Sequence, residues 1–149
     1  MRIVPIILGS LAVFATNTPP ERVENVGYFM GWAEKISGLK NVGPLPEIAL
    51  LSDAEIQREY CSEGVITADC QVYGYLRGTR IAVNKELSPR DMEMTIVHEL
   101  AHHLHFVTGT FQSRCWSEKH AAMVEWAYES AVYDSWEPFV FNKDWYNCP

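Results

Sequence analysis

Positive charge is scarce in this chain of 149 residues. Its 12 lysines and arginines stand against 19 aspartates and glutamates, which gives a formal net charge of −7. The basic residues are scattered along the sequence, whereas binding to a nucleic-acid backbone requires them in clusters. We therefore expect no nucleic-acid partner, and we attribute the excess of acidic residues to solubility.

Repeats, low-complexity tracts and Cys-x-x-Cys pairs are also missing. Without such cysteine pairs, we do not expect a zinc site built from cysteines. The composition, 48% hydrophobic and 12% aromatic, is that of a folded globular protein, and the length suits one domain around a single core.

The N-terminus has the features of an export signal. Residues 1–15 open with Arg2, continue through an apolar run at residues 3–14 and end in the cleavable pattern Val13-Phe14-Ala15. The run is short for a membrane span but fits the core of a secretory signal; an N-terminal anchor or a buried element is the alternative.

We predict a signal peptide at residues 1–15 and a single domain at residues 16–149, exported to the periplasm or secreted. We expect no membrane contact beyond an uncleaved N-terminal segment. The four cysteines agree with export, because an even number in an exported protein indicates disulfides. Of the three ways to pair them, we predict neighbours in sequence, Cys61 with Cys70 and Cys115 with Cys148.

Capping residues and hydrophobic spacing predict the secondary structure. We expect a helix from a Thr18 cap to Gly38, a strand at 47–51, a short helix at 53–60, a hairpin with strands at 72–76 and 79–84, a helix between Ser88 and Gly109, and a helix from about Trp116 to Trp136 with Ser117 as its cap. An aromatic tail after Pro138 then folds back over the domain. Of the hairpin strands, Thr79–Asn84 is our candidate for an edge that pairs with an extended substrate, with an ordinary sheet strand as the alternative.

The helix between Ser88 and Gly109 carries His98-Glu99-Leu100-Ala101-His102, an H-E-x-x-H arrangement. On a helix, this spacing brings both imidazoles to one face, where they can bind one ion, with the carboxylate of Glu99 beside it. Zinc lowers the pKa of a bound water towards about 7, and a carboxylate can then accept the proton of that water. We predict His98 and His102 as ligands of Zn²⁺ and Glu99 as the general base.

A catalytic zinc needs a third protein ligand. The extended metzincin pattern is excluded, because His105 and Thr108 occupy the positions where it requires glycine and histidine. The next helix offers Glu118, Glu125 and Glu129. We favour Glu118, because the small residue Ala121 three positions on lets two helices approach closely, and we place Glu125 second.

The segment from Val72 to Glu125 resembles the compact gluzincin zinc peptidases, in which an H-E-x-x-H helix is followed by a helix carrying E-x-x-A. The resemblance implies His98, His102 and Glu118 as zinc ligands and Glu99 as general base. It also implies a small zincin-like α+β fold, with a short sheet and β-hairpin packed on the motif helix, and a peptide or protein substrate.

The chain departs from the large gluzincins in lacking an obvious second lobe. No motif identifies the residue that stabilises the developing oxyanion; His120, Tyr128 and Tyr75 are our candidates. We expect His103 and His105 to be hydrogen-bonded or exposed rather than ligands, with His105 able to support a ligand. The function we expect is that of a zinc metallopeptidase; the alternative is a catalytically silent zincin-like metal-binding or interaction domain of the cell envelope.

Overall fold

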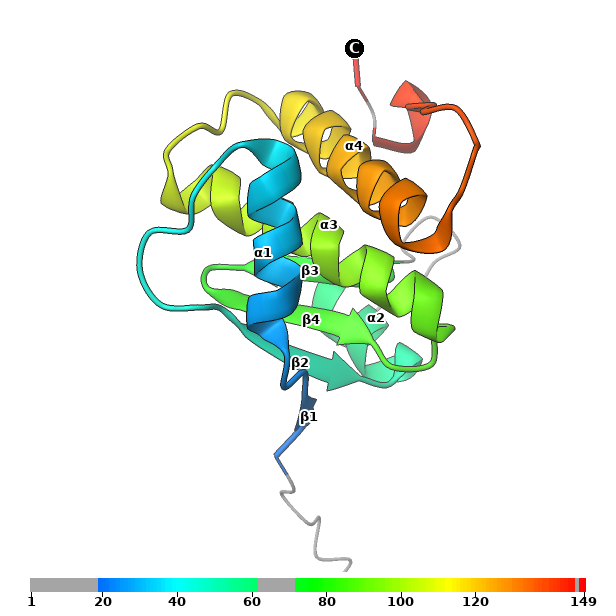
Figure 1. Ribbon diagram of the computed structural model, residues 1–149. Coiled ribbons are helices and arrows are strands. Elements are labelled where there is room, and N and C mark those ends of the chain that lie inside the picture. The colour runs from blue at the N-terminus through cyan, green and yellow to red at the C-terminus, as the bar shows by residue number, and fades with distance from the viewer. Residues whose placement is uncertain (1–18, 62–71, 147) are drawn as a thin grey trace, which may run out of the picture.

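The computed structural model describes residues 19–61, 72–146 and 148–149. In this part of the chain, helices surround a small mixed sheet, which confirms the α+β class (Figure 1). In chain order the elements are β1 (Glu21–Arg22), α1 (Val26–Ser37), β2 (Glu47–Leu51), α2 (Asp53–Tyr60), β3 (Gly74–Arg77), β4 (Arg80–Asn84), α3 (Pro89–Val107), α4 (Arg114–Tyr133) and the 3₁₀ helix η2 (Lys143–Tyr146). The predicted signal peptide at residues 1–15 and Cys70 lie outside the described residues.

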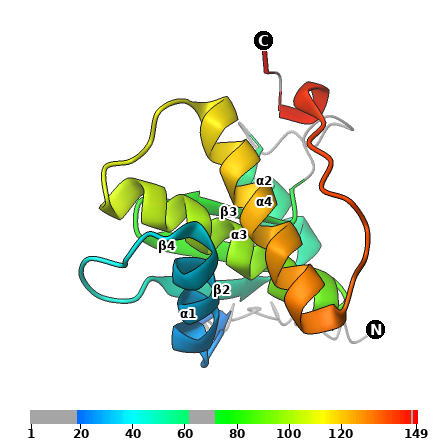
Figure 2. The ribbon, with the colours of Figure 1, turned by 45° about the horizontal axis from the view of Figure 1, so that its top comes forward.

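The sheet has the strand order β1-β2-β4-β3, and β4 pairs parallel with β2 and antiparallel with β3. Alternate residues of the strands face two different sets of helices. Ile48, Ile81 and Val83 pack into the main core with α1, α3 and α4, whereas Ala49 and Ala82 pack with Ile56 of α2 on the other face. The sheet therefore lies between these helices, and α3 rests directly on it (Figure 2).

The prediction that Thr79–Asn84 forms an edge for pairing with an extended substrate is wrong. Strand β4 covers most of this segment and is hydrogen-bonded on both sides, so it has no free edge for a substrate. Among the described residues, the edge strands of the sheet are β1 and β3 instead. β4 is central because its Ile81-Ala82-Val83 run is fully buried on both faces of the sheet.

The first helix begins later than the sequence predicts. Thr18 lies outside the described residues, but Glu21 and Arg22 form β1, and α1 begins only at Val26. The amide of Val23 donates to the carbonyl of Ile48 at 3.0 Å, so this backbone is used by the sheet rather than by a helix. The predicted end is confirmed: Gly38 has φ 74° and closes the helix.

The predicted strand at 47–51, the helix at 53–60, the hairpin and the motif helix are confirmed with small shifts at their ends. Ser52 and Glu55 form the capping box that begins α2, and Gly78 has φ 63° in the hairpin turn. The hydroxyl of Ser88 accepts from the amide of Asp91 to begin α3, and Gly109 follows its end with φ 67°. The motif helix is therefore the best-specified element of the chain.

Helix α4 begins at Arg114 with Ser113 as its cap, so the predicted cap, Ser117, is wrong. Ser117 lies in the second turn and is buried. The helix ends at Tyr133, because Asp134 adopts a left-handed conformation with φ 53°. Among the described residues, no helix is long and apolar enough to cross a membrane.

The C-terminal tail, described over residues 134–146 and 148–149, turns back along α4, as predicted (Figure 2). The indole of Trp126 donates to the carbonyl of Glu137 at 2.7 Å, near the end of the helix. At the other end, a disulfide joins Cys148 to Cys115 in the first turn of α4, which confirms that predicted pair. The tail is thus held antiparallel to the helix at two points.

Candidate metal centre

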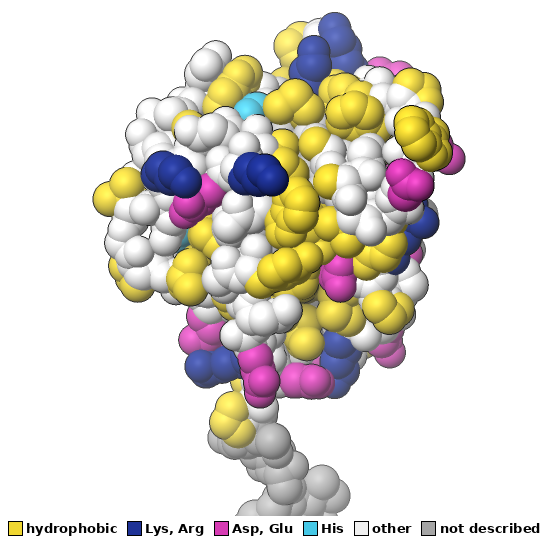
Figure 3. Space-filling view, viewed as in Figure 1, with side chains coloured by type: hydrophobic (Ala, Val, Ile, Leu, Met, Phe, Trp, Pro, Cys, Tyr) yellow, Lys and Arg dark blue, Asp and Glu magenta, His cyan; other side chains and the backbone are white. Residues whose placement is uncertain are grey.

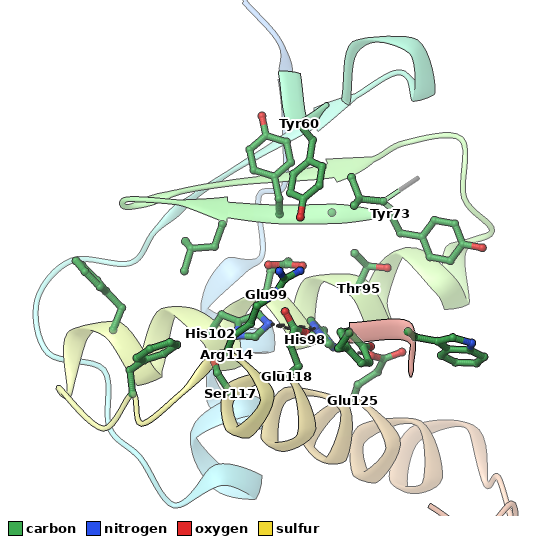
Figure 4. Close-up of a pocket in the computed structure, with 18 of the residues that line it drawn as sticks. Tyr60, Tyr73, Thr95, His98, Glu99, His102, Arg114, Ser117, Glu118 and Glu125 are labelled. Atoms are coloured by element: carbon green, nitrogen blue, oxygen red, sulfur yellow. Dashed lines mark hydrogen bonds and ion pairs between the residues drawn. The ribbon is translucent and has the colours of Figure 1, made fainter. Parts of the chain in front are cut away.

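Helices α3 and α4 bring the predicted ligands together (Figure 4). His98 and His102 lie on the face of α3 that packs against α4, and Glu118 lies opposite them in α4. Nε2 of His98 is 3.2 Å from Nε2 of His102, and each is 3.3 Å from Oε2 of Glu118. These three atoms form a nearly equilateral group that could hold a metal ion.

The size of this donor triangle fits zinc. In a tetrahedral zinc site with ligand distances of about 2.0–2.1 Å, neighbouring ligand atoms are about 3.3–3.4 Å apart. The observed separations of 3.2–3.3 Å leave little rearrangement for the ion to impose. Three protein donors also leave the fourth position of a tetrahedron open, as a catalytic site requires.

The other nitrogen of each histidine is also engaged. Nδ1 of His98 lies 2.8 Å from Oε2 of Glu125, and Nδ1 of His102 lies 2.8 Å from the hydroxyl of Ser117. With Nε2 on a metal, each Nδ1 carries the hydrogen and donates it to these oxygens, which fixes the orientation of both rings. Glu125 thus supports a ligand and is not part of the donor triangle, while Glu129 pairs with Arg90 instead.

A chain of hydrogen bonds continues from Ser117 to two further histidines. The Ser117 hydroxyl is 2.8 Å from Nδ1 of His105, whose Nε2 is 2.6 Å from Nδ1 of His120. Burial first, and then neighbouring histidines, lower the pKa of His105 to about 4, so its ring is neutral. The serine hydroxyl can therefore accept from His102 and donate to His105, which supports the ligand as the sequence suggested.

His103 takes no part in the site. Its ring is buried, and its Nε2 lies 2.9 Å from the side-chain oxygen of Asn41 in the loop after α1. This agrees with the expectation that His103 is hydrogen-bonded within the fold.

Glu99 lies beside the donor triangle and is almost fully buried, with 7% of its surface exposed. Burial raises the pKa of its carboxyl above the ordinary value. The adjacent strand β3 approaches closely at Gly74, where a Cβ would lie only 2.6 Å from Cγ2 of Thr95 and 3.4 Å from Cγ of Glu99. A glycine is therefore required for the sheet to lie this near the carboxylate.

In the metal-free chain, one member of the donor triangle, His98, holds an extra proton. Burial lowers the pKa of His98, but hydrogen bonds to Glu118 and Glu125 outweigh this effect and raise that pKa to about 10. Burial acts on Glu118 in the opposite sense to its hydrogen bonds from His102 and His98, which prevail and lower its pKa. Without a metal, the protonated imidazole of His98 is therefore paired with the carboxylates of Glu118 and Glu125. A bound cation would take the place of the proton on His98.

The donor triangle opens into a cleft of about 1060 Å³. Its walls come from the end of α2, β3 and the residues just before it, α3, the loop after α3, α4 and the tail. They are rich in aromatic side chains: Tyr60, Tyr73, Tyr75, Phe106, Phe111, Trp145 and Tyr146. Arg114 contributes a positive charge to the same cleft. On the face seen in Figure 3, Lys and Arg side chains are scattered and form no continuous patch.

Comparisons with known proteins add no relative. No family model, no curated protein and no solved structure matches this chain.

Two of the three oxyanion candidates, His120 and Tyr128, do not line the cleft, and the hydroxyl of the third, Tyr75, is already hydrogen-bonded. His120 bonds to His105, and Tyr128 is fully buried with its hydroxyl donating to Glu93. Tyr75 lines the cleft, but its hydroxyl donates to Glu59.

Sequence reasoning missed Ser117, Glu125 as a hydrogen-bond partner, and Tyr146. One signal was available: Glu118 and Glu125 are seven residues apart, which places both on one face of a helix.

Proposed function

We propose that this protein is an exported zinc metallopeptidase with a zincin-like arrangement of helix and sheet. The observation that carries the proposal is the zinc-sized triangle of His98, His102 and Glu118, with the buried carboxylate of Glu99 beside it in an open cleft. A purely structural zinc site has four protein ligands and no use for a base next to an open position.

The metal, when bound, supplies an acidified water and a Lewis acid that polarises a carbonyl. Glu99 accepts a proton at its carboxylate and later returns it to the leaving amine, a role that its raised pKa favours. Glu125 and Ser117 keep the two imidazoles oriented. The surrounding protein thus supplies the base and the positioning.

The walls of the cleft suit an extended peptide. Strand β3 lines the cleft, and among the described residues it pairs only with β4; an unpaired strand edge can bind a substrate backbone by hydrogen bonds. The aromatic walls favour apolar side chains of the substrate. Export is supported weakly by the Cys115–Cys148 disulfide and more directly by the signal-like residues 1–15.

The test begins with metal content, measured by mass spectrometry on wild type and His98→Ala purified without chelators. We expect about one zinc per chain in the wild type and none in the variant. Glu99→Gln should keep its zinc while peptide turnover falls by about 10²-fold to 10⁴-fold, because the general base is lost.

Three outcomes separate the proposal from its rivals. Zinc bound without hydrolysis of a peptide library by the wild type would indicate a metal-binding domain. Equal turnover in wild type and Glu99→Gln would remove Glu99 as the base. Wild-type protein that binds no zinc even after incubation with the metal would refute the metal site itself.

A further inference from the structure

The C-terminal tail forms a wall of the candidate metal centre. Trp145 and Tyr146, both in η2, line the same cleft as the donor triangle, and the η2 ribbon passes beside Glu125 in Figure 4. Two contacts fix η2 at this place: the disulfide between Cys148 and Cys115, and the stacking of Phe141 on Tyr146 with ring centroids 5.2 Å apart. The wall thus depends on a covalent link to the first turn of α4.

The hydroxyl of Tyr146 differs from those of Tyr75, Tyr128 and Tyr133. The hydroxyls of Tyr75, Tyr128 and Tyr133 donate to glutamates, whereas that of Tyr146 has no hydrogen-bond partner among the described residues. Its ring is half-buried, and its hydroxyl is within electrostatic reach of Glu99, Glu118 and Glu125. A tyrosine with an unpartnered hydroxyl therefore lines the same cleft as the donor triangle and Glu99.

The Tyr146 hydroxyl also keeps its proton. Burial, followed by the charges of Glu118, Glu125 and Glu99, raises its pKa to about 12. At neutral pH the phenol is therefore neutral and can donate a hydrogen bond, although it cannot readily accept a proton.

We propose that the disulfide-linked tail completes the reaction site, and that the hydroxyl of Tyr146 donates a hydrogen bond to the substrate oxygen on which negative charge develops. The inference rests on the proposed peptidase function. When water attacks the carbonyl carbon, a C–O bond forms and the C=O electron pair moves to the carbonyl oxygen. The C–N bond then breaks, and the amine leaves with the proton that Glu99 took from the water, while Tyr146 keeps its own proton.

The first arm of the test compares zinc-loaded wild type with Tyr146→Phe. Loss of one oxyanion donor lowers kcat by about 10²-fold to 10³-fold, and we expect this loss with little change in KM or in zinc affinity. Tyr28→Phe, a change on the exposed side of α1, is the matched control and should leave all three values unchanged. Equal melting temperatures would show that both variants fold.

The second arm needs no turnover. A dipeptide phosphonate carries a fixed tetrahedral anion, and its affinity for the zinc-loaded protein can be measured by calorimetry. We expect the affinity to fall by about 10²-fold or more in Tyr146→Phe, because the same donor serves this anion. If wild type binds the phosphonate but cleaves no peptide, the peptidase proposal fails while this comparison still decides the role of Tyr146.

The third arm tests the tail. The double variant Cys115→Ser/Cys148→Ser should lose phosphonate affinity as Tyr146→Phe does, and adding Tyr146→Phe to it should cost little more, because the two changes remove one interaction. Phosphonate affinity within twofold of wild type in Tyr146→Phe, or no phosphonate binding by zinc-loaded wild type, would overturn the inference. Fully additive losses would refute the dependence of Tyr146 on the disulfide.

Discussion

At the scale of single residues, Ser117 shows how a buried hydroxyl can serve a metal site without touching the metal. It lies 2.8 Å from Nδ1 of His102 and 2.8 Å from Nδ1 of His105, and its own surface is almost entirely buried. Ser117→Ala leaves the hydrogen on His102 without an acceptor. We expect zinc affinity to fall by about 10-fold to 100-fold, measured by competition with a chelator of known affinity.

Helix α4 offers a matched control for this change. The hydroxyl of Ser130 is buried and has no hydrogen-bond partner among the described residues. Ser130→Ala also removes a serine hydroxyl from α4, but at the opposite end of the helix from Glu118. This change should leave zinc affinity unchanged. A similar loss of affinity in both variants would mean that packing of α4, and not the hydrogen bond, accounts for the effect.

The residues of the donor triangle were accessible from the sequence, and their supporting partners were not. His98, Glu99 and His102 follow from spacing within one helix, and Glu118 follows from a short-range pattern in the next. The roles of Ser117 and Tyr146 depend on how α3, α4 and the tail pack together. Ser117 even carries the local signal of a helix cap, which Ser113 overrides by accepting from the amide of Trp116.

At the scale of elements, the approach of β3 to α3 at Gly74 sets the width of the site. A Cβ there would meet Cγ2 of Thr95 at 2.6 Å and the carbonyl oxygen of Ala82 at 3.0 Å. We expect Gly74→Ala to lower the free energy of unfolding by about 1–3 kcal/mol, because one of these contacts is to rigid backbone. Turnover should fall as well, since the shift also reaches Glu99; denaturant unfolding and peptide kinetics measure the two effects.

Gly31 provides the comparison, because a Cβ at this position in α1 meets nothing within 4 Å. Gly31→Ala should raise the free energy of unfolding by up to about 1 kcal/mol through lower backbone entropy in the unfolded chain. Gly74→Ala as stable and active as wild type would show that β3 can move away from α3 freely.

Element ends with local signals were predictable, and those set by pairing were not. Ser52 and Ser88 cap their helices through contacts within four residues, as their sequences indicate. The central position of β4 and the pairing of β1 with β2 arise from contacts distant in sequence. The misplaced substrate edge at Thr79–Asn84 and the early helix start after Thr18 have this common cause.

At the scale of the whole molecule, metal binding changes the charge of the protein by less than the charge of the ion. In the metal-free chain the pKa of His98 is about 10, so at pH 7 this imidazole holds a proton that must leave before Nε2 can bind zinc. We expect about one proton to be released per zinc bound, measured by calorimetry in buffers of different ionisation enthalpy.

The sign of the pH dependence follows from the same group. Because the pKa of His98 lies above neutral pH, lowering the pH favours the protonated, metal-free form, and zinc affinity should fall by about tenfold per pH unit around neutrality. His98→Ala should abolish both binding and release. Zinc binding without proton release would mean that His98 is neutral before the ion arrives.

The position of Cys148 has a practical consequence for purification. Pro149 follows Cys148, which is bonded to the first turn of α4 one turn before Glu118, whereas β1 lies at the opposite end of the molecule in Figure 1. A polyhistidine tag fused after Pro149 would place extra imidazoles within reach of the cleft. There they would compete for zinc and block access to Tyr146. A tag joined ahead of β1 keeps those imidazoles away from the cleft. The metal content of the purified protein then reports the metal bound by the protein itself.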